Sequence, residues 1–363
     1  MSLTAHTWLQ RITSLAFPDK KIRVINVCGG HERTITQTGI RTILKDQVVL
    51  IPGPGCPVCV CPEEDIFAAI HIALNNPVTV VAFGDMLRVP VNLPPTMPRS
   101  LEQAKAAGGD ILPIASPMEA VQLAKKRPDR QIVFFAAGFE TTMAPVAAMI
   151  QQDLPDNLSL LISGRLTWPA VKLLLSSEHL NFDALIAPGH VATVAGPEEW
   201  AFVAQHHNLP VAVSGFTPDQ LLAGLFSVLK QVVEGQAFLD NCYGGVVRPG
   251  GNPGAIKLLQ DTLDIVDAPW RGLGIIPNSS YQLKSAWQDH DAQRRFPIPD
   301  QEKNRLRARQ MPPGCDCAAV ILGRIPPTHC RLYGEACSPR HPVGPCMVSE
   351  EGACRIWWTH RVS

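Results

Sequence analysis

The sequence predicts an α/β protein with two small doubly wound α/β domains and a third domain that is cysteine-rich and mostly helical or irregular. Short β-rich runs alternate with amphipathic segments from residue 22 to about residue 216, which is typical of a parallel sheet flanked by helices. This alternation fades after residue 235. Six of the eleven cysteines then follow residue 314. These observations together favour two α/β units and a separate thiol-rich unit.

Seven β-rich runs give the predicted strands, which are 22–27, 48–52, 78–83, 131–137, 158–163, 183–187 and 211–216. Four amphipathic segments between them predict helices at 65–74, 101–107, 118–126 and 170–176. A region of this length fits two small domains better than one large sheet. We therefore expect one α/β domain at 22–125, a second at 126–216, and the cysteine-rich domain at 217–363.

Unusual loops follow five of the predicted strands. They begin with Cys28-Gly-Gly-His, Gly53-Pro-Gly-Cys, Gly84-Asp-Met, Gly138-Phe-Glu-Thr-Thr and Pro188-Gly-His-Val. Ligands of parallel α/β folds bind at the carboxyl ends of the strands, where such loops lie. Five loops of this kind predict a functional face along that edge.

Composition excludes some partners and suggests a compartment. The 32 basic and 32 acidic residues cancel, so overall charge gives no support for a nucleic-acid or membrane partner. Residues 1–17 lack a basic leader, and no stretch approaches the ~18 apolar residues of a membrane span. We expect a cytoplasmic protein, in which closely spaced cysteines are more often ligands or catalytic thiols than structural disulfides.

The C-terminal cysteines form the pattern C-x12-C-x6-C-x16-C. Its members are Cys317, Cys330, Cys337 and Cys354, while Cys315 and Cys346 fall outside it. Four thiolates on loops can hold a [4Fe–4S] cluster or a zinc ion. Structural zinc sites usually contain C-x2–4-C knuckles, so the wider spacing favours the iron–sulfur cluster. Unligated core cysteines are the alternative.

Cys28 lies at the end of a predicted strand and just before a predicted helix. The helix N-terminus favours the thiolate, and Gly29 and Gly30 let the backbone come close to a ligand. His31 and Glu32 could accept, donate or shuttle a proton. A small apolar cysteine in a tight turn is the alternative.

Cys56 and Cys59 form a C-x-x-C motif flanked by prolines. This spacing allows a reversible disulfide or two adjacent soft metal ligands. Half of a structural zinc site is the alternative. Cys61 could be a third ligand or a packed core residue.

Four further residues have both a functional and a structural interpretation. Glu140 and Thr141 open a helix and could form an anion-binding turn, or the threonine could only cap the helix. His190 could carry a proton or be a hydrogen-bonded loop histidine. Glu351 could relay protons beside the cysteine-rich tail or be a solvated loop residue.

Five motifs in this order resemble the HypD family of hydrogenase maturation factors. They are C-G-G-H-E-R-T (28–34), G-P-G-C-P-V-C (53–59), G-F-E-T-T (138–142), A-P-G-H-V (187–191) and M-V-S-E-E-G-A-C (347–354). The resemblance implies two Rossmann-like α/β domains and an iron–sulfur domain that includes residues 1–21. It also implies a scaffold, with redox activity, on which the Fe(CN)2CO unit of [NiFe]-hydrogenases is assembled.

The resemblance assigns roles and partners as well. Cys28 would bind iron together with a cysteine of the small chaperone HypC, and His31 would support that site. HypE would supply cyanide. Cys56 and Cys59 would form the redox pair, and the four cysteines of the tail pattern would bind the [4Fe–4S] cluster. Glu351 and His190 would assist, while Arg33 replaces a histidine often found in the family and could attract the anionic iron unit.

Two other functions remain open from the residues alone. An iron–sulfur-dependent disulfide reductase would use Cys56 and Cys59 but has no need of Cys28. A zinc-stabilised α/β binding protein would be colourless, whereas an iron–sulfur protein is brown.

Overall fold

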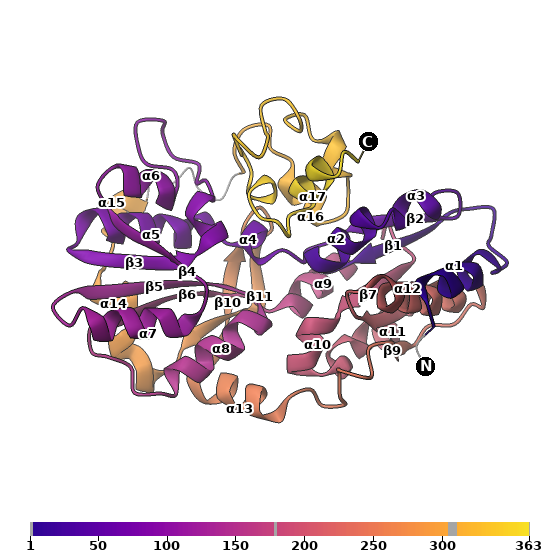
Figure 1. The fold of residues 1–363 in the computed structure, drawn as a ribbon, viewed down its shortest axis with the longest axis horizontal. Coiled ribbons are helices and arrows are strands. Elements are labelled where there is room, and N and C mark those ends of the chain that lie inside the picture. Colours follow the sequence, from indigo (N-terminus) through magenta and orange to yellow (C-terminus); the bar gives the residue numbers. More distant parts are fainter. Residues whose placement is uncertain (1–2, 178–179, 304–310, 363) are drawn as a thin grey trace.

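The computed structural model describes residues 3–177, 180–303 and 311–362. It contains two parallel sheets, one antiparallel hairpin and a cysteine-rich C-terminal region that lies over the junction between the sheets (Figure 1). The predicted α/β class with a separate thiol-rich region is thereby confirmed.

The first sheet has five parallel strands in the order β2-β1-β7-β8-β9. These are β2 (Val48–Pro52), β1 (Ile22–Asn26), β7 (Ala184–Pro188), β8 (Val211–Ser214) and β9 (Leu239–Asn241). The second sheet has four in the order β4-β3-β5-β6. These are β4 (Asp110–Ile114), β3 (Val78–Phe83), β5 (Gln131–Gly138) and β6 (Leu158–Gly164). All seven predicted strands are present, and β4 and β9 are additional.

The expected sequence ranges of the two sheets are wrong. The chain builds β1 and β2, leaves to form the whole second sheet, and returns with β7 to pair directly with β1. The ranges 22–125 and 126–216 therefore each contain strands of both sheets. Alternation along the sequence locates strands but does not indicate which of them pair, and the crossover from β2 to β3 looks like any other connection.

Helices cover both faces of each sheet (Figure 1). One face of the first sheet packs against α1 (Ala5–Thr13), α2 (Gly29–Gln37), α3 (Ile40–Ile43) and α12 (Pro218–Val233). The other face packs against α9 (Thr167–Leu175), α10 (Gly189–Ala195) and α11 (Ala201–His207), with η2 (Pro197–Trp200) beside them. The second sheet lies between α5 (Glu63–Asn75) with α6 (Leu101–Ala106) and α7 (Pro117–Lys126) with α8 (Glu140–Ile150).

The region after residue 217 differs from the expected third domain. The strand β9 is part of the first sheet, and the helix α12 packs on that sheet. The helix α1 in turn packs on α12 through Trp8 and Phe226, whose ring centroids lie 5.4 Å apart. The described residues 3–21 thus pack with the core of the first sheet and not with the cysteine-rich region. The helix α13 (Pro253–Thr262) and an antiparallel hairpin of β10 (Leu263–Trp270) and β11 (Gly274–Leu283) follow.

The remaining elements are short. They are α4 (Pro57–Val60), η1 (Gly84–Arg88), η3 (Ser285–His290), α14 (Ala292–Arg295), α15 (Asp300–Lys303), α16 (Cys317–Ile321), η4 (Pro327–His329), η5 (Pro345–Met347) and α17 (Ala353–Thr359). The tail is therefore largely irregular, as expected for a proline-rich and glycine-rich sequence. Within the described ranges, no helix has the length and apolar character needed to cross a membrane.

Candidate metal and thiol site

Cys28 occupies the turn between β1 and α2, at the carboxyl edge of the first sheet. It caps α2 in an extended conformation and remains partly exposed. The backbone N–H groups of Gly30 and His31 point to its sulfur and lower its pKa. The site thus offers one thiol on a partly exposed residue, with two N–H donors aimed at its sulfur.

The sequence predicts that the helix N-terminus favours the thiolate of Cys28, and the two N–H groups do act in that direction, but burial opposes them. Desolvation and the carboxylate of Glu351 raise the pKa of the Cys28 thiol to about 12, which outweighs the two N–H groups. The sulfur is therefore protonated at neutral pH. A soft metal ion can displace this proton, because metal ligation favours the thiolate over the thiol.

Three loops converge on Cys28, and glycines make room for them. A Cβ on Gly55 would lie 2.3 Å from the backbone nitrogen of Cys28, and one on Gly29 would lie 2.4 Å from the carbonyl oxygen of Glu351. A Cβ on Gly30 would lie 2.8 Å from the ring of Phe216. Because these glycines have no side chains, the C-x-x-C loop, the tail and Phe216 can pack closely around the turn that carries Cys28.

A stack of three rings borders the thiol. His31 stacks on Phe216 at 4.6 Å between ring centroids, and Phe216 stacks on His190 at 3.8 Å. The predicted residue His190 therefore belongs to the same site as Cys28. Phe216 was missed as a site residue, although its place directly after a glycine at the end of a strand was a usable signal.

His31 is completely buried and neutral. Its Nε2–H donates to the carbonyl oxygens of Ser214 and Gly215, both at 3.1 Å, while Nδ1 has no partner among the described residues. Burial lowers the pKa of His31 to about 4. Its unpaired Nδ1 can therefore accept a hydrogen bond or bind a metal at neutral pH.

Acidification should destabilise the protein through His31. Its pKa is lower in the folded chain than the ordinary 6.5, so the unfolded chain takes up the proton first as pH falls. We expect the free energy of unfolding to decrease from pH 6.5 to pH 4, by up to about 3 kcal/mol relative to a His31→Gln variant. Denaturant titrations of both proteins at several pH values measure this difference, and parallel pH profiles would contradict it.

Glu32 has a structural position. Its carboxylate accepts hydrogen bonds from Asn26 at 2.9 Å and from the indole N–H of Trp357 at 2.6 Å, and it pairs with Arg41 at 2.5 Å. These contacts join α2 to α17, and the guanidinium of Arg41 also lies over the Trp357 ring. These contacts support a structural role for Glu32, which is to hold the tail against α2, in place of the predicted proton transfer.

Loss of this buried charge should loosen the tail. Glu32→Gln leaves Arg41 without its ionic partner, so we expect the free energy of unfolding to fall by about 3 kcal/mol. Glu350→Gln is the matched control, because Glu350 pairs with Arg33 at an exposed position and should change stability by less than about 1 kcal/mol. Chemical denaturation of the two variants measures the difference; equal effects would argue against the docking role.

The tail loop that carries Glu351 is fixed to both sheets. Arg33 donates to the carbonyl oxygen of Glu350 at 2.9 Å and forms an ion pair with its carboxylate. The hydroxyl of Ser349 donates to Asp85, in the Gly84-Asp-Met loop after β3. Arg33 is therefore engaged with the tail, and its predicted attraction of the iron unit has no support from these contacts.

Cys56 and Cys59 are joined by a disulfide across α4. The preceding residue, Gly55, accepts a hydrogen bond from the backbone N–H of Gly29, so the disulfide follows immediately after the turn that touches Cys28. Both cysteines are also buried in one apolar cluster with tail cysteines. The disulfide thus lies between the Cys28 loop and the tail.

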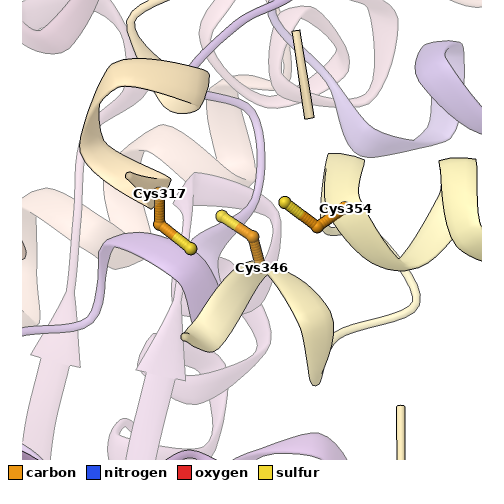
Figure 2. A group of neighbouring side chains, drawn as sticks. All are labelled: Cys317, Cys346 and Cys354. Atoms are coloured by element: carbon orange, nitrogen blue, oxygen red, sulfur yellow. The ribbon is translucent and has the colours of Figure 1, made fainter. Parts of the chain in front are cut away.

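Three tail thiols converge in the interior. The sulfurs of Cys317, Cys346 and Cys354 all lie within 4.8 Å of one another, and Figure 2 shows the three side chains gathered together. The sulfur of Cys315 lies 3.3 Å from that of Cys317. The thiols of Cys317 and Cys346 lower the pKa of Cys354 by hydrogen bonding to its sulfur. These four thiols form a donor set of the kind that iron–sulfur clusters use.

The observed group differs from the predicted tail pattern. Cys317 and Cys354 are common to both, and Cys346 joins them, while Cys330 and Cys337 lie outside this group but near enough for the charge of Cys315 to act on their thiols. The sulfur of Cys330 instead contacts the backbone of Asp316 at 3.5 Å, and that of Cys337 contacts Val343 at 3.4 Å. Spacing alone could not distinguish these thiols, because the irregular loops between them determine which sulfurs meet.

Gly344 explains how the tail packs so closely. A Cβ at this position would lie 2.5 Å from the sulfurs of both Cys315 and Cys317. Only glycine lets the backbone approach these sulfurs without displacing them.

Glu140 and Thr141 lie on the second sheet's edge and are not linked to Cys28. The buried carboxylate of Glu140 accepts from the backbone N–H and the hydroxyl of Thr167, each at 2.6 Å, and Thr141 is exposed. A carboxylate therefore occupies the helix start where an anion was expected. The predicted anion-binding turn is wrong for this reason.

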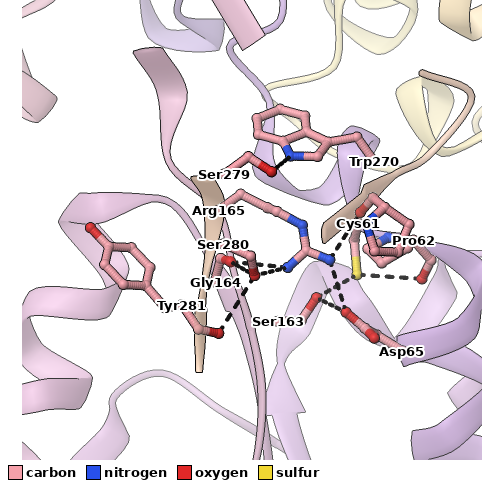
Figure 3. Close-up of polar contacts among 11 residues, drawn as sticks. Cys61, Pro62, Asp65, Ser163, Gly164, Arg165, Trp270, Ser279, Ser280 and Tyr281 are labelled. Carbon is pink, nitrogen blue, oxygen red and sulfur yellow. Dashed lines mark hydrogen bonds and ion pairs between the residues drawn. The ribbon is translucent and has the colours of Figure 1, made fainter. Parts of the chain in front are cut away.

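Cys61 is a packed thiol. Its sulfur lies 3.4 Å from the hydroxyl of Ser163, beside a network in which buried Arg165 donates to Asp65 and to Ser280 (Figure 3). Burial raises the pKa of Cys61 to about 12. This network joins the second sheet to the β10–β11 hairpin, and among the described residues Cys61 belongs to no group of three metal-binding side chains.

Comparisons with known proteins agree on one family. A family model for HypD, described as "Hydrogenase formation hypA family", matches residues 3–361. The hydrogenase maturation factor HypD of Azotobacter vinelandii is 37% identical over 98% of this chain and 94% of its own. The HypD of Escherichia coli is 36% identical over 97% of this chain and 93% of its own. A putative hydrogenase expression/formation protein of Methanocaldococcus jannaschii is also 36% identical, over 97% and 96%.

Proposed function

This chain belongs to the HypD family of hydrogenase maturation factors, and from that membership we propose that it is the scaffold on which the Fe(CN)2CO unit of [NiFe]-hydrogenases is assembled. The iron cargo would bind Cys28 together with a cysteine of a HypC-type chaperone, and a HypE-type partner would supply cyanide. The observation that carries the proposal is the setting of Cys28, a partly exposed soft ligand with two N–H donors aimed at its sulfur.

Binding of iron to Cys28 requires loss of the thiol proton. Because the pKa of the free thiol is about 12, metal ligation and deprotonation occur together. Glu351 is the acceptor that we propose for this proton, since its carboxylate is close enough to raise the pKa of Cys28. Burial also raises the pKa of Glu351, which favours proton uptake.

The two histidines would position the cargo. The unpaired Nδ1 of His31 offers one acceptor, and the Phe216 ring fixes His31 and His190 at the edge of the site. Partial exposure of Cys28 is consistent with a unit that must leave after assembly.

The tail thiols fit a resident [4Fe–4S] cluster. Cys317, Cys346 and Cys354 would hold it, and Cys315 supplies a fourth thiol next to Cys317. When bound, such a cluster supplies electrons one at a time. The Cys56–Cys59 disulfide takes up two electrons and two protons on reduction, and its dithiol returns them on oxidation. Its position between the tail and Cys28 supports a part in redox steps during assembly.

An iron–sulfur-dependent disulfide reductase is the second candidate. It is favoured by the packing of the Cys56–Cys59 disulfide and the tail cysteines in one apolar cluster. Such an enzyme leaves Cys28 and its surrounding glycines without a purpose, so the scaffold is the better-supported function.

Infrared spectroscopy distinguishes the two functions. The chain would be co-expressed with its small chaperone and the cyanide donor, and purified without oxygen. Sharp cyanide and CO stretching bands are expected for the scaffold. A silent spectrum from a brown, iron-loaded protein would favour the reductase.

A further inference from the structure

A pocket of about 360 Å³ lies away from the thiols, where α8, α10 and α13 meet β11. Its wall is mostly apolar, with Leu259, Leu263 and Ile265 from α13 and β10, and it includes the aromatic residue Trp168. The volume is within the range of small-molecule sites. The proposed assembly function uses none of these residues.

Two carboxylates enter this apolar pocket. Glu140 is 2% exposed and is held by Thr167, whereas Glu199 makes no hydrogen bond or ion pair with any described residue. Burial raises the pKa of both carboxyl groups, and the charge of Glu199 contributes to the shift at Glu140. The described residues that line the pocket include no Lys, Arg or His, so nothing in the lining neutralises these two carboxyl groups when they ionise.

A tyrosine hydroxyl completes the polar part of the pocket. Tyr281 is 7% exposed, and its hydroxyl has no hydrogen-bond partner among the described residues. The ring points away from the Arg165 network that occupies the other side of β11 (Figure 3). Burial raises the pKa of Tyr281, and the charges of Glu140 and Glu199, which line the same pocket, raise it further. A hydroxyl without a partner in the lining of the pocket is available to hydrogen-bond a ligand.

The residues that line the pocket favour an organic cation over a metal ion as its ligand. Over the described ranges, the tail cysteines alone bring three metal-binding side chains together, so these two carboxylates lack a third such ligand. An apolar wall with two aromatic rings suits a hydrocarbon body, and aromatic faces also attract ammonium groups. A carboxylate without a partner supplies the counter-charge.

We propose that this pocket binds a small organic monocation, with its ammonium group between Glu140, Glu199 and the Tyr281 hydroxyl and its apolar body against Trp168, Leu259 and Leu263. The ligand would lie between helices of both sheets, since α8 follows β5 and α10 follows β7. This site is separate from the proposed iron and thiol chemistry.

Phenethylammonium is a suitable probe because it combines an ammonium head with a compact aromatic body. We expect the full-length chain to bind it with a dissociation constant on the order of 0.1–1 mM in saturation-transfer NMR titrations. The neutral analogue 2-phenylethanol and the anion phenylacetate should bind at least roughly tenfold more weakly, because neither satisfies the carboxylates.

Two variants locate the probe. Glu199→Gln should weaken phenethylammonium binding roughly tenfold, and Tyr281→Phe should weaken it by a smaller factor. Glu198→Gln is the matched control. It should leave binding unchanged, because Glu198 is exposed and lies outside the lining. Circular dichroism would establish that the variants are folded. Equal binding of the three probes, no binding of the cation, or equal affinity in Glu199→Gln and the parent chain would each overturn the proposal.

Discussion

Cys28→Ala is expected to abolish the infrared bands of iron-bound cyanide and CO while the tail keeps its iron. Alanine offers no ligand, and no other thiol replaces it: Cys56 is bound to Cys59, and the described tail thiols lie in the interior. The loss should be essentially complete, because cyanide-bearing and CO-bearing iron needs a soft anchor. Infrared intensity per protein, with absorption near ~400 nm recorded for the cluster, measures both effects.

Cys242→Ala is the matched control for this experiment. Cys242 is also a partly exposed thiol, but its sulfur contacts Asp240 and the carbonyl oxygen of Ala223, away from the site. Its removal should leave the bands in place. Retention of the bands in Cys28→Ala would refute the assignment of the iron to this residue.

Cys354→Ala should remove most of the iron and sulfide bound by the tail. This residue belongs both to the pattern expected from spacing and to the group of sulfurs that the fold brings together. It also begins α17, whose Trp357 docks on Glu32, so loss of the metal should loosen that helix. Chemical analysis of iron and sulfide after anaerobic purification gives the result directly.

Loss of metal in Cys354→Ala can be distinguished from general unfolding of the chain. The two sheets have their own apolar cores, which contain no tail cysteine, so far-UV circular dichroism should change little. Cys242→Ala again serves as the control and should keep its full iron content. A normal complement of iron and sulfide in Cys354→Ala would show that the thiol group is not the cluster site.

The sequence predicts the strands well and their pairing poorly. The seven β-rich runs are continuous apolar segments, which is typical of buried parallel strands. β4 was missed because Pro113 interrupts its sequence, a residue that only an edge strand accommodates, and β4 is an edge strand. The β10–β11 hairpin was missed because proline, aspartate and asparagine punctuate it. Pairing of β1 with β7 depends on contacts across 160 residues, which no local pattern encodes.

For the candidate site, too, the local features were predictable from the sequence and the long-range contacts were not. Its location at the carboxyl edge of strands was predictable, and Cys28, His31 and His190 meet there as the loops suggested. The protonation state of Cys28 was not predictable, because the pKa of its thiol depends on burial and on Glu351, which comes from the other end of the chain. The structural role of Glu32 likewise depends on Trp357, which is 325 residues away.

Iron-57 Mössbauer spectroscopy of the anaerobic chain with its chaperone tests the central claim most directly. We predict two iron environments: low-spin ferrous iron that carries the diatomic ligands at Cys28, and cluster iron in the tail. Cys28→Ala should lose only the first. Cluster iron alone in the parent chain, or low-spin ferrous iron that persists in Cys28→Ala, would contradict the scaffold proposed here.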